Sequence, residues 1–377
     1  MSDTLCIALL GAGQLGGSFM LALRENGADI HVTAYDPATH HSEELRARGA
    51  VDTVCVSAAE ATKGADIVLL ASPLRTYRSL MLEIAPALED GVILTDLGSA
   101  KGIMYSIAHF APRAHIVPAH PIAGSEKSGP AAARGDLFQN RLCILTPDES
   151  TDTEAFRAIE ALWNLAGADV IAMPHQVHDQ IYAYVSHLPH YIAFVAAGYF
   201  HRLGIRVGAD EAMLQQFLRI SRSNPRMWTD VALENREALL PVLGTYIALL
   251  EHFATELRAG ESTPAAGKQE TAKALLPRVL AASLISSVSL YEQQSGSNLR
   301  PFGAGGMRDI VAPAAVTPEA DTEAMSNHAS TMADIIEGII PDFRALESYI
   351  GAEDEPKLYA AISHMVEDAH ALIAPRN

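Results

Sequence analysis

The chain is poor in cysteine and in basic residues, and both shortages narrow what it can be. Only three of its 377 residues are cysteine, namely Cys6, Cys55 and Cys143, and no two of them form a CxxC pair. We therefore expect free thiols in a reducing compartment rather than a disulfide framework. Lysine and arginine number 27 against 45 aspartate and glutamate residues, which gives a formal net charge of −18. Because an acidic chain without a basic run repels phosphate backbones and anionic lipid, we expect neither nucleic acid nor a membrane surface as a partner.

Uninterrupted apolar runs are also scarce. The most apolar stretch, residues 274–291, contains Pro277 and Arg278, so it predicts a buried helix rather than a membrane span. The first residues include Asp3 and no basic segment, which is unlike a secretory signal and favours a cytoplasmic location. With 49% hydrophobic and 19% charged residues over 377 positions, the composition indicates a globular protein of two or three domains.

Strands alternate with helices in the first half of the chain, which favours right-handed crossovers and a mostly parallel sheet. This pattern predicts an α/β domain over residues 1–174. The predicted helices include residues 14–26 and 153–166. The predicted strands are 5–10, 30–35, 67–71, 92–95, 116–117, 142–146 and 169–172.

Helical patterns replace strands after residue 174. We expect an all-α domain over 175–260, a linker rich in small and polar residues over 261–273, and an additional helical region over 274–377. Two short sequences, Leu-Pro-His-Tyr at 188–191 and Leu-Pro-Arg-Val at 276–279, each open an apolar helix. The additional region is therefore either a degenerate copy of 175–260 or an unrelated helical bundle. The predicted helices are 176–203, with a kink at Pro189, and 234–259, 274–291, 324–349 and 356–373.

A glycine-rich turn joins the first strand to the first helix. In this turn Gly11 permits a tight bend, Gly13 lets the backbone approach a pyrophosphate, and Gly16 lets the helix pack closely on the strand. Asp36 follows 20 residues after Gly16, at the end of the second strand. A carboxylate there accepts hydrogen bonds from ribose hydroxyls and repels a 2′-phosphate. The pattern predicts a Rossmann-type dinucleotide-binding domain that takes NAD rather than NADP; a purely structural turn with a surface aspartate is the alternative.

Polar segments follow several strands at the carboxyl edge of the predicted sheet, where open α/β sheets bind ligands. They are residues 71–74, 96–101 and 120–129. His120 begins the third segment, and an imidazole suits the removal of a proton from an alcohol while hydride leaves the same carbon. Ser99, at a neighbouring strand end, is placed to orient that imidazole. The alternative is a histidine with a structural role only.

Taken together with the His178-Asp179 pair and with segments 186–190 and 219–228, these motifs resemble the prephenate/arogenate dehydrogenase family of tyrosine biosynthesis. The resemblance covers roughly residues 5–258. It implies an NAD-dependent enzyme that oxidises and decarboxylates prephenate to 4-hydroxyphenylpyruvate. Arogenate dehydrogenase, which forms tyrosine, and a dual cyclohexadienyl dehydrogenase remain open alternatives.

The resemblance also implies roles for individual residues. His120 would be the base, supported by Ser99. A guanidinium such as that of Arg219 is needed because the substrate is a dianion in an acidic protein. His187 and His190 lack a third ligand, so no metal is expected, and His178 is taken for a polar residue at a helix start. The implied substrate-binding residues are His190, Arg219, Ser125, Glu126, His187 and Trp228. The implied cofactor-binding residues are Gly11, Gly13, Gln14, Leu15, Gly16, Asp36, Ser72, Pro73 and Ser99.

The chain departs from the family pattern at one motif. The family carries a Gly-Gly-Phe-Arg-Asp-like segment just before the arginine that Arg219 matches, but residues 213–218 have no glycine. A very similar segment, Gly-Gly-Met-Arg-Asp, occurs at 305–309, where Ala312 takes the place of that arginine and Arg278 that of His190. Since the family dimerises through its helical domain, we expect either a homodimer or an intrachain pseudo-dimer. In the second case Gly306 or Asp309 would be lent to the substrate pocket.

Two other classes of protein compete with this interpretation. A β-hydroxyacid dehydrogenase would carry a catalytic lysine on the long interdomain helix, where this chain has His187 and His190. A non-catalytic NAD-binding sensor has no need of a base, whereas His120, Ser99 and Arg219 occur together here.

Overall fold

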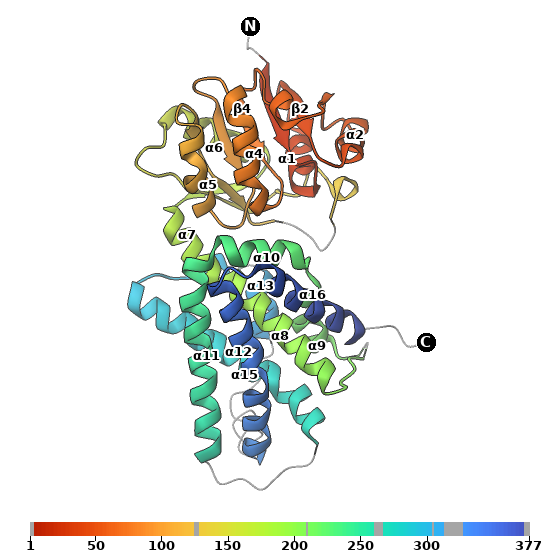
Figure 1. Cartoon of the computed structure of the whole chain (residues 1–377), viewed down its shortest axis with the longest axis vertical. Helices are drawn as coiled ribbons and strands as arrows, with labels where there is room; N and C mark the ends of the chain where they lie inside the picture. The colour runs from red at the N-terminus through yellow and green to blue at the C-terminus, as the bar shows by residue number, and fades with distance from the viewer. Residues whose placement is uncertain are drawn as a thin grey trace. The chain divides into compact units, whose positions relative to one another are not determined.

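The computed structural model describes residues 4–123, 128–208, 210–259, 267–303, 305–312 and 327–372 (Figure 1). It divides into two compact units, residues 1–179 and 180–377. The division falls inside helix α7 (His175–Tyr182), about one helical turn after the boundary expected from the sequence. Each unit has its own core, and each is described separately below.

The first unit is built on a six-stranded sheet in the order β3-β2-β1-β4-β5-β6, with every neighbouring pair parallel. The chain winds outward in both directions from the β1–β4 pair, which makes the carboxyl ends of these two strands the expected ligand position. The predicted α/β class is confirmed. The strands are β1 (Leu5–Leu10), β2 (Ile30–Tyr35), β3 (Thr53–Val54), β4 (Ile67–Leu70), β5 (Ile93–Asp96) and β6 (His115–Ile116).

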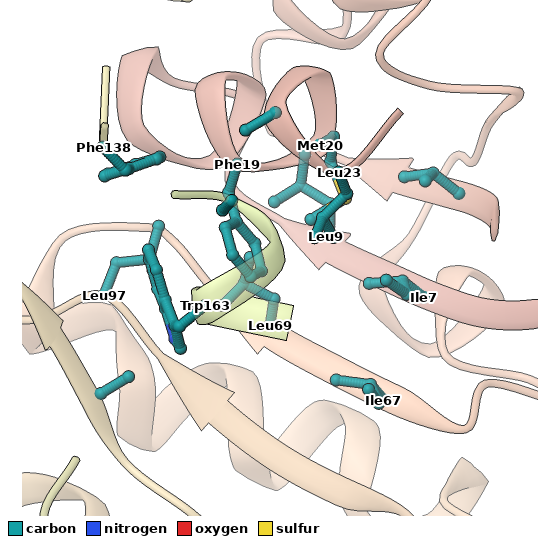
Figure 2. Close-up of a cluster of buried hydrophobic side chains, with 14 of the residues drawn as sticks. Ile7, Leu9, Phe19, Met20, Leu23, Ile67, Leu69, Leu97, Phe138 and Trp163 are labelled. Atoms are coloured by element: carbon teal, nitrogen blue, oxygen red, sulfur yellow. The ribbon is translucent and has the colours of Figure 1, made fainter. Parts of the chain in front are cut away.

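Helices cover this sheet and bury its apolar runs. On one face, Phe19 of α1 stacks on Trp163 of α6 with ring centroids 4.2 Å apart, and Phe138 meets the same indole edge-on (Figure 2). These rings lie over Leu9 and Leu69 of the two central strands. The core therefore anchors α1, which is joined to β1 by the short turn at residues 11–13. The helices are α1 (Gln14–Glu25), α2 (Thr39–Ala47), α3 (Ala58–Ala61), α4 (Tyr77–Ile84), α5 (Gly102–Ile107) and α6 (Thr153–Leu165).

A second, three-stranded sheet completes the first unit. Strand β7 (Ala119–Pro121) pairs antiparallel with β8 (Leu142–Leu145), which pairs parallel with β9 (Asp169–Ala172). The two late strands predicted from the sequence thus belong to this smaller sheet. Strands β3 and β7 were not predicted, because two or three residues are too few to show a period of two. His120 lies in the middle of β7, opposite Ile144.

The second unit is helical, as predicted, and α8 (Leu188–Arg202) runs through its centre. Every residue of α8 except His190, His201 and Arg202 is buried. The long helix predicted for 176–203 is interrupted by a wide turn, Ala183–His187, directly before Leu188-Pro189, because proline supplies no backbone N–H to the preceding turn. The other helices are α9 (Ala212–Phe217), α10 (Pro225–Glu234), α11 (Arg236–Ala259), α12 (Lys268–Ser295), α13 (Gly305–Val311), α15 (Ala329–Gly351) and α16 (Glu355–Leu372).

Helix α12 contains the apolar stretch at 274–291 and buries residues from Thr271 to Val288, as expected of a core helix. It begins at Lys268, inside the segment predicted as a linker; residues 260–266 lie outside the described residues. By length and composition α11 and α12 would each suffice to cross a membrane. In this unit both helices pack against α15, and 39% and 56% of their most apolar windows are buried.

Candidate active site

The glycine-rich turn has the geometry that its sequence predicts. Gly11 has a φ of +107°, and a Cβ there would lie 2.6 Å from the backbone of Ala71 and Ser72, so only glycine fits. At Gly16 a Cβ would lie 2.7 Å from Leu9 Cδ1, which explains the close packing of α1 on β1. At Gly13 nothing lies within 4 Å of the added atom. The middle glycine is therefore the one that leaves room for a ligand.

The start of α1 and the end of β2 frame this open space. Gly13 is the N-cap of α1 and offers no side chain to the first N–H groups of that helix, and such helix starts are sites where proteins bind phosphate. The Asp36 carboxylate accepts the N–H groups of Ala12 and Ala38, both at 2.9 Å. It is thereby fixed beside the turn, where it can also accept ribose hydroxyls. This arrangement fits a dinucleotide that carries no phosphate on its ribose.

The other predicted cofactor residues lie around the same turn. Gln14 donates to the carbonyl of Ala132 at 3.3 Å, and Leu15 is half-buried against the core. Ser72 follows β4, and its Oγ lies 2.7 Å from Thr76 Oγ1. Pro73 directly follows Ser72 and precedes a short 3-10 turn at Leu74–Thr76.

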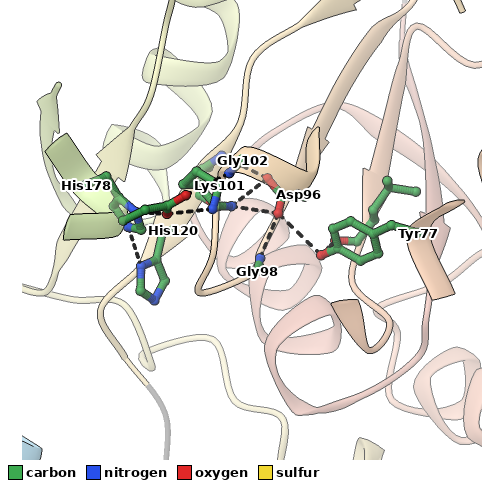
Figure 3. A network of polar contacts seen from close by, with 10 residues as sticks. Tyr77, Asp96, Gly98, Lys101, Gly102, His120 and His178 are labelled. Carbon is green, nitrogen blue, oxygen red and sulfur yellow. Dashed lines mark hydrogen bonds and ion pairs between the residues drawn. The ribbon is translucent and has the colours of Figure 1, made fainter. Parts of the chain in front are cut away.

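A buried ion pair fixes the end of β5. Lys101 and Asp96 are both fully buried, and Lys101 Nζ lies 2.8 and 2.6 Å from the two carboxylate oxygens (Figure 3). The same ammonium donates to the carbonyl of Ala119 at 2.6 Å. The Asp96 carboxylate also accepts the N–H of Gly98 at 2.9 Å. Three partners for the ammonium and several donors for the carboxylate are what a buried pair requires. Lys101 thereby ties β5 to β7, the strand of His120.

His120 belongs to a relay of three side chains. Its Nδ1 lies 2.8 Å from Nε2 of His178, and Nδ1 of His178 lies 2.8 Å from Oδ1 of Asp179 (Figure 3). The Asp179 carboxylate also accepts the backbone N–H groups of Lys101 and Gly102, at 2.8 and 2.9 Å. The relay therefore ends on a carboxylate that is held in place by the first turn of α5.

The relay determines which nitrogen of His120 carries a proton. Because the Asp179 carboxylate only accepts, His178 donates from Nδ1. Burial, with the charges of Lys101 and His175, lowers the pKa of His178 well below its ordinary value, so His178 is neutral and its Nε2 accepts. His120 must then donate from Nδ1, which puts its lone pair on Nε2. The relay thus prepares Nε2 of His120 to accept a proton and places a carboxylate where it can stabilise the resulting charge.

The contact of His178 with His120 is what the sequence interpretation missed. His178 does lie in the first turn of α7, as predicted, but its ring is fully buried and contacts His120. The His178-Asp179 motif was noted in the sequence, but 58 residues separate the two histidines, so nothing local indicated their contact. Ser99 is half-buried and makes no hydrogen bond to His120 in the described part of the chain, so its supporting role stays a prediction. Ser125 and Glu126 lie outside the described residues.

The second unit gathers a different group of predicted residues. His190 stacks on Trp228 with ring centroids 3.6 Å apart, and its Nδ1 donates to the carbonyl of Ser186 at 2.8 Å. Burial, against the opposing effect of the hydrogen bond to the Ser186 carbonyl and with a smaller contribution from the charge of Arg219, lowers the pKa of His190 to about 3. His190 is therefore neutral, with its proton on Nδ1 and its lone pair on Nε2. On its other side the ring contacts Gly306, where a Cβ would lie 3.2 Å from Cε1.

Arg219 lies beside this pair of rings. Its Nε and Nη2 bind the same oxygen of Asp309, at 2.8 and 2.5 Å. The guanidinium is 46% exposed, whereas the Asp309 carboxylate is 8% exposed. Among the described residues no hydrogen bond or ion pair involves Nη1 of Arg219. One edge of the fork is thus fixed by Asp309, and the other can bind a carboxylate.

His187 lies apart from this group. It is fully buried, and its Nδ1 lies 2.9 Å from Nδ2 of Asn235. Its ring meets that of Trp228 edge-on with centroids 6.0 Å apart, so it packs against the indole on which His190 stacks. Among the described residues no group of three or more histidine, cysteine, aspartate or glutamate side chains is placed so that it could hold a metal ion.

The neutral state of His190 makes the stability of the protein depend on pH. Unfolding restores an ordinary histidine pKa of about 6.5, so below that pH the unfolded chain binds a proton that the folded chain does not. The free energy of unfolding should fall by about 2 kcal/mol between pH 7 and pH 5 through this residue alone. Urea titrations of the wild type and of His190→Asn, whose amide can still donate to Ser186, isolate that contribution. Equal pH dependence in the two proteins would contradict it.

Comparisons with known proteins agree with this division of the chain. Residues 19–172 match the nucleotide-binding domain of prephenate dehydrogenase, and residues 174–264 match the dimerization domain of the same family. The chain is 35% identical over 257 residues to a cyclohexadienyl dehydrogenase of Zymomonas mobilis, covering 67% of this chain and 88% of that protein. It is 30% identical over 264 residues to a prephenate dehydrogenase of Bacillus subtilis, covering 68% and 70%.

Solved structures give the same result. The prephenate dehydrogenase of Aquifex aeolicus in complex with hydroxyphenyl propionate and NAD+ is 29% identical to this chain, with a TM-score of 0.61. That match covers 68% of this chain and 91% of the other. An arogenate dehydrogenase of Synechocystis is 26% identical, with a TM-score of 0.55 over 67% and 91% of the two chains.

Proposed function

Because the chain belongs to the prephenate/arogenate dehydrogenase family, we propose that it catalyses the NAD-dependent oxidative decarboxylation of prephenate to 4-hydroxyphenylpyruvate. The observation that carries this proposal is the Asp179–His178–His120 relay, which leaves the lone pair of His120 on Nε2. A hydride-transfer enzyme that acts on an alcohol needs such a proton acceptor, and a protein that only binds nucleotides does not.

Prephenate presents a ring hydroxyl, a ring carboxylate and a side-chain carboxylate. Nε2 of His120 takes the hydroxyl proton while the carbon–hydrogen bond at the same ring carbon breaks. NAD, held at the glycine-rich turn, would supply the acceptor for that hydride. The ring carboxylate leaves as CO2 and its bonding electrons complete the aromatic ring. His120 then returns its proton to the phenol oxygen, so the reaction releases no net proton.

The substrate is an anion, and the cluster of the second unit suits it. Nη1 of Arg219 would bind a carboxylate, while Asp309 holds the other edge of the guanidinium. His190 is neutral and stacked on Trp228, so it offers Nε2 to a donor on the substrate without adding charge. These contacts would hold the substrate by its acid groups without taking part in proton transfer.

NAD is the cofactor that the first unit fits best. The open space at Gly13, the uncapped start of α1 and the fixed Asp36 carboxylate would hold the pyrophosphate and the adenosine ribose. A 2′-phosphate would meet Asp36 directly, so we expect much weaker use of NADP.

Arogenate differs from prephenate by an amino group in place of the side-chain ketone, and the similar Zymomonas protein is named a cyclohexadienyl dehydrogenase. Initial rates of NADH formation, followed by absorbance with prephenate or arogenate and with NAD or NADP, separate the alternatives. We expect turnover with prephenate and NAD. Comparable rates with arogenate would indicate a dual cyclohexadienyl enzyme, and the absence of turnover with both substrates would favour a non-catalytic NAD sensor.

Replacing the predicted carboxylate-binding arginine should weaken substrate binding. In Arg219→Gln we expect KM for prephenate to rise about 10- to 100-fold, as for the loss of one charge-assisted contact, with the Kd of NAD unchanged. Arg222→Gln is the matched control, because Arg222 is exposed three residues away. Steady-state kinetics and NAD titration by fluorescence measure both effects. An equal KM in Arg219→Gln and Arg222→Gln would show that Arg219 does not bind the substrate.

A further inference from the structure

The C-terminal helices form one folded unit with the matched dimerization domain, although residues 265–377 lie beyond both family matches. We propose that residues 268–351 are an internal second copy of the helical domain, and that this copy takes the place of a partner subunit. One chain would then be a monomer with a single complete substrate site. The site assignment, although not the oligomeric state, rests on the function proposed above.

Helices α11 and α15 pack side by side and antiparallel (Figure 1). Near the end of α11, Arg258 forms ion pairs with Asp334 and Glu337 in the first turns of α15. At the opposite ends of the two helices, Gly351 lies against Leu240. The contact therefore extends along most of both helices.

The two helices also share a sequence feature. Each carries a proline in its interior after two large aliphatic residues, in Leu-Leu-Pro at 239–241 and in Ile-Ile-Pro at 339–341. Midway along the contact, Tyr246 meets Phe343 with ring centroids 5.4 Å apart. In a symmetric dimer, a two-fold axis brings the same helix of both subunits together, antiparallel and in contact at their midpoints. Helices α11 and α15 have this arrangement.

A second contact lies where such an axis should pass. Gln216 stands three residues before Arg219, and Asp309 stands three residues before Ala312, so the two occupy equivalent positions in the two copies. Gln216 Nε2 donates to Oδ1 of Asp309 at 3.3 Å. Equivalent residues touch each other only near a two-fold axis.

Three further sets of contacts between the two copies follow the same exchange. The helices that contain the Leu-Pro motifs, α8 and α12, contact each other. Helix α13 of the second copy contacts α8, and α9 of the first copy contacts α12. Likewise α15 contacts α8, and α11 contacts α12. Each contact thus has a counterpart in which the two copies are interchanged.

The two copies are not chemically equal. The second copy has Arg278 where the first has His190 and Ala312 where it has Arg219, so it cannot form a second site of the same kind. It contributes instead to the first: Gly306 supports the His190 ring, and the buried Asp309 holds Arg219. Asp309 is therefore a positioning residue for Arg219, supplied by the segment that replaces the partner.

The mass of the particle tests the monomer directly. Sedimentation equilibrium of the full chain at assay concentration should give about one chain mass, 40.3 kDa. A stable two-chain particle would overturn the proposal. This measurement does not depend on activity, so it is informative even if the substrate assignment fails.

A cross-link tests whether α11 and α15 come from one chain. Glu251 and Arg344 form an exposed ion pair between these helices. In the double variant Glu251→Cys/Arg344→Cys, a short bismaleimide should join the helices within one chain, giving a single-chain band in a denaturing gel and a linked peptide pair by mass spectrometry. The two single-cysteine variants control for the native thiols. A band of twice the chain mass that requires both cysteines would overturn the proposal.

Asp309 is tested by its effect on substrate binding alone. Asp309→Asn should raise KM for prephenate about 10-fold while kcat stays within about threefold and NAD binding is unchanged, and Asp309→Glu should recover part of the loss. Titration with hydroxyphenyl propionate should give one binding site per chain in the wild type and weaker binding in Asp309→Asn. Unchanged KM and unchanged affinity for this probe would refute the positioning role.

Discussion

Replacing His120 with asparagine should lower kcat about 10³-fold, within the range observed when a general base is removed. The asparagine amide can still donate to Nε2 of His178, so the relay and strand β7 should persist. What is lost is the lone pair at the position that accepts the hydroxyl proton. The Kd of NAD should not change, because the residues that frame its expected position lie at the turn after β1 and the end of β2.

The matched control for this variant is His109→Asn. His109 is exposed in the turn Ala108–Phe110, where its ring lies against Phe110 and not against the relay. It should keep kcat within about twofold of the wild type. Stopped-flow and steady-state measurement of NADH formation give both values. Unchanged turnover in His120→Asn would show that the imidazole takes no part in the reaction. The proposed function would then lose the relay as its main support.

The second large effect is expected for Asp179→Asn. The carboxylate accepts from His178, Lys101 and Gly102 at once, and an amide has only one oxygen to do so. When that oxygen serves Gly102, the NH2 group faces Nδ1 of His178 and reverses its tautomer. His178 then donates to His120, whose proton moves to Nε2. Loss of the correct tautomer in a comparable relay costs about 10⁴ in kcat, and we expect a decrease of about 10²- to 10⁴-fold here.

The pH profile separates this tautomer effect from simple damage to the fold. With the wrong tautomer, Nε2 of His120 cannot accept the hydroxyl proton. As pH rises, removal of that proton depends less on His120, so kcat of Asp179→Asn should recover part of its loss in alkaline buffer. Circular dichroism and the thermal midpoint show whether the fold persists. Asp169→Asn, an exposed carboxylate on β9, is the control. An activity loss independent of pH, or none, would contradict the relay.

Local patterns were sufficient to predict the fold of the first unit. The strands predicted at 5–10 and 30–35 match β1 and β2 residue for residue, because β1 is a continuous apolar run and β2 alternates buried with less buried residues, both patterns being typical of strands. The glycine-rich turn could also be predicted, because a side chain at Gly11 or Gly16 would clash with the segments packed against it. Strand β7 escaped prediction because three residues carry no period, although it holds His120.

The candidate site was predicted less completely, because its decisive contacts join distant parts of the chain. Motifs identified His120 and Arg219. The residues that they contact could not be identified in the same way, because nothing in the sequence around those contact residues indicates the pairing. His178 is 58 residues from His120, and Asp309 is 90 residues from Arg219. The sequence raised Asp309 as a contributor only through the displaced Gly-Gly-Met-Arg-Asp segment. Spacing alone says nothing of such contacts, which depend on how α13 and α7 pack.

Lys101 has a consequence for how the catalytic apparatus would fail. Its ammonium holds the strand of His120 through the carbonyl of Ala119, while its own backbone N–H holds Asp179. Both terminal members of the relay thus depend on one residue, His120 through the Lys101 ammonium and Asp179 through the Lys101 backbone N–H. We therefore expect the two ends of the relay, His120 and Asp179, to loosen together rather than one before the other. Heat or substitution should switch the reaction off in one cooperative step, before the nucleotide-binding turn itself is disturbed.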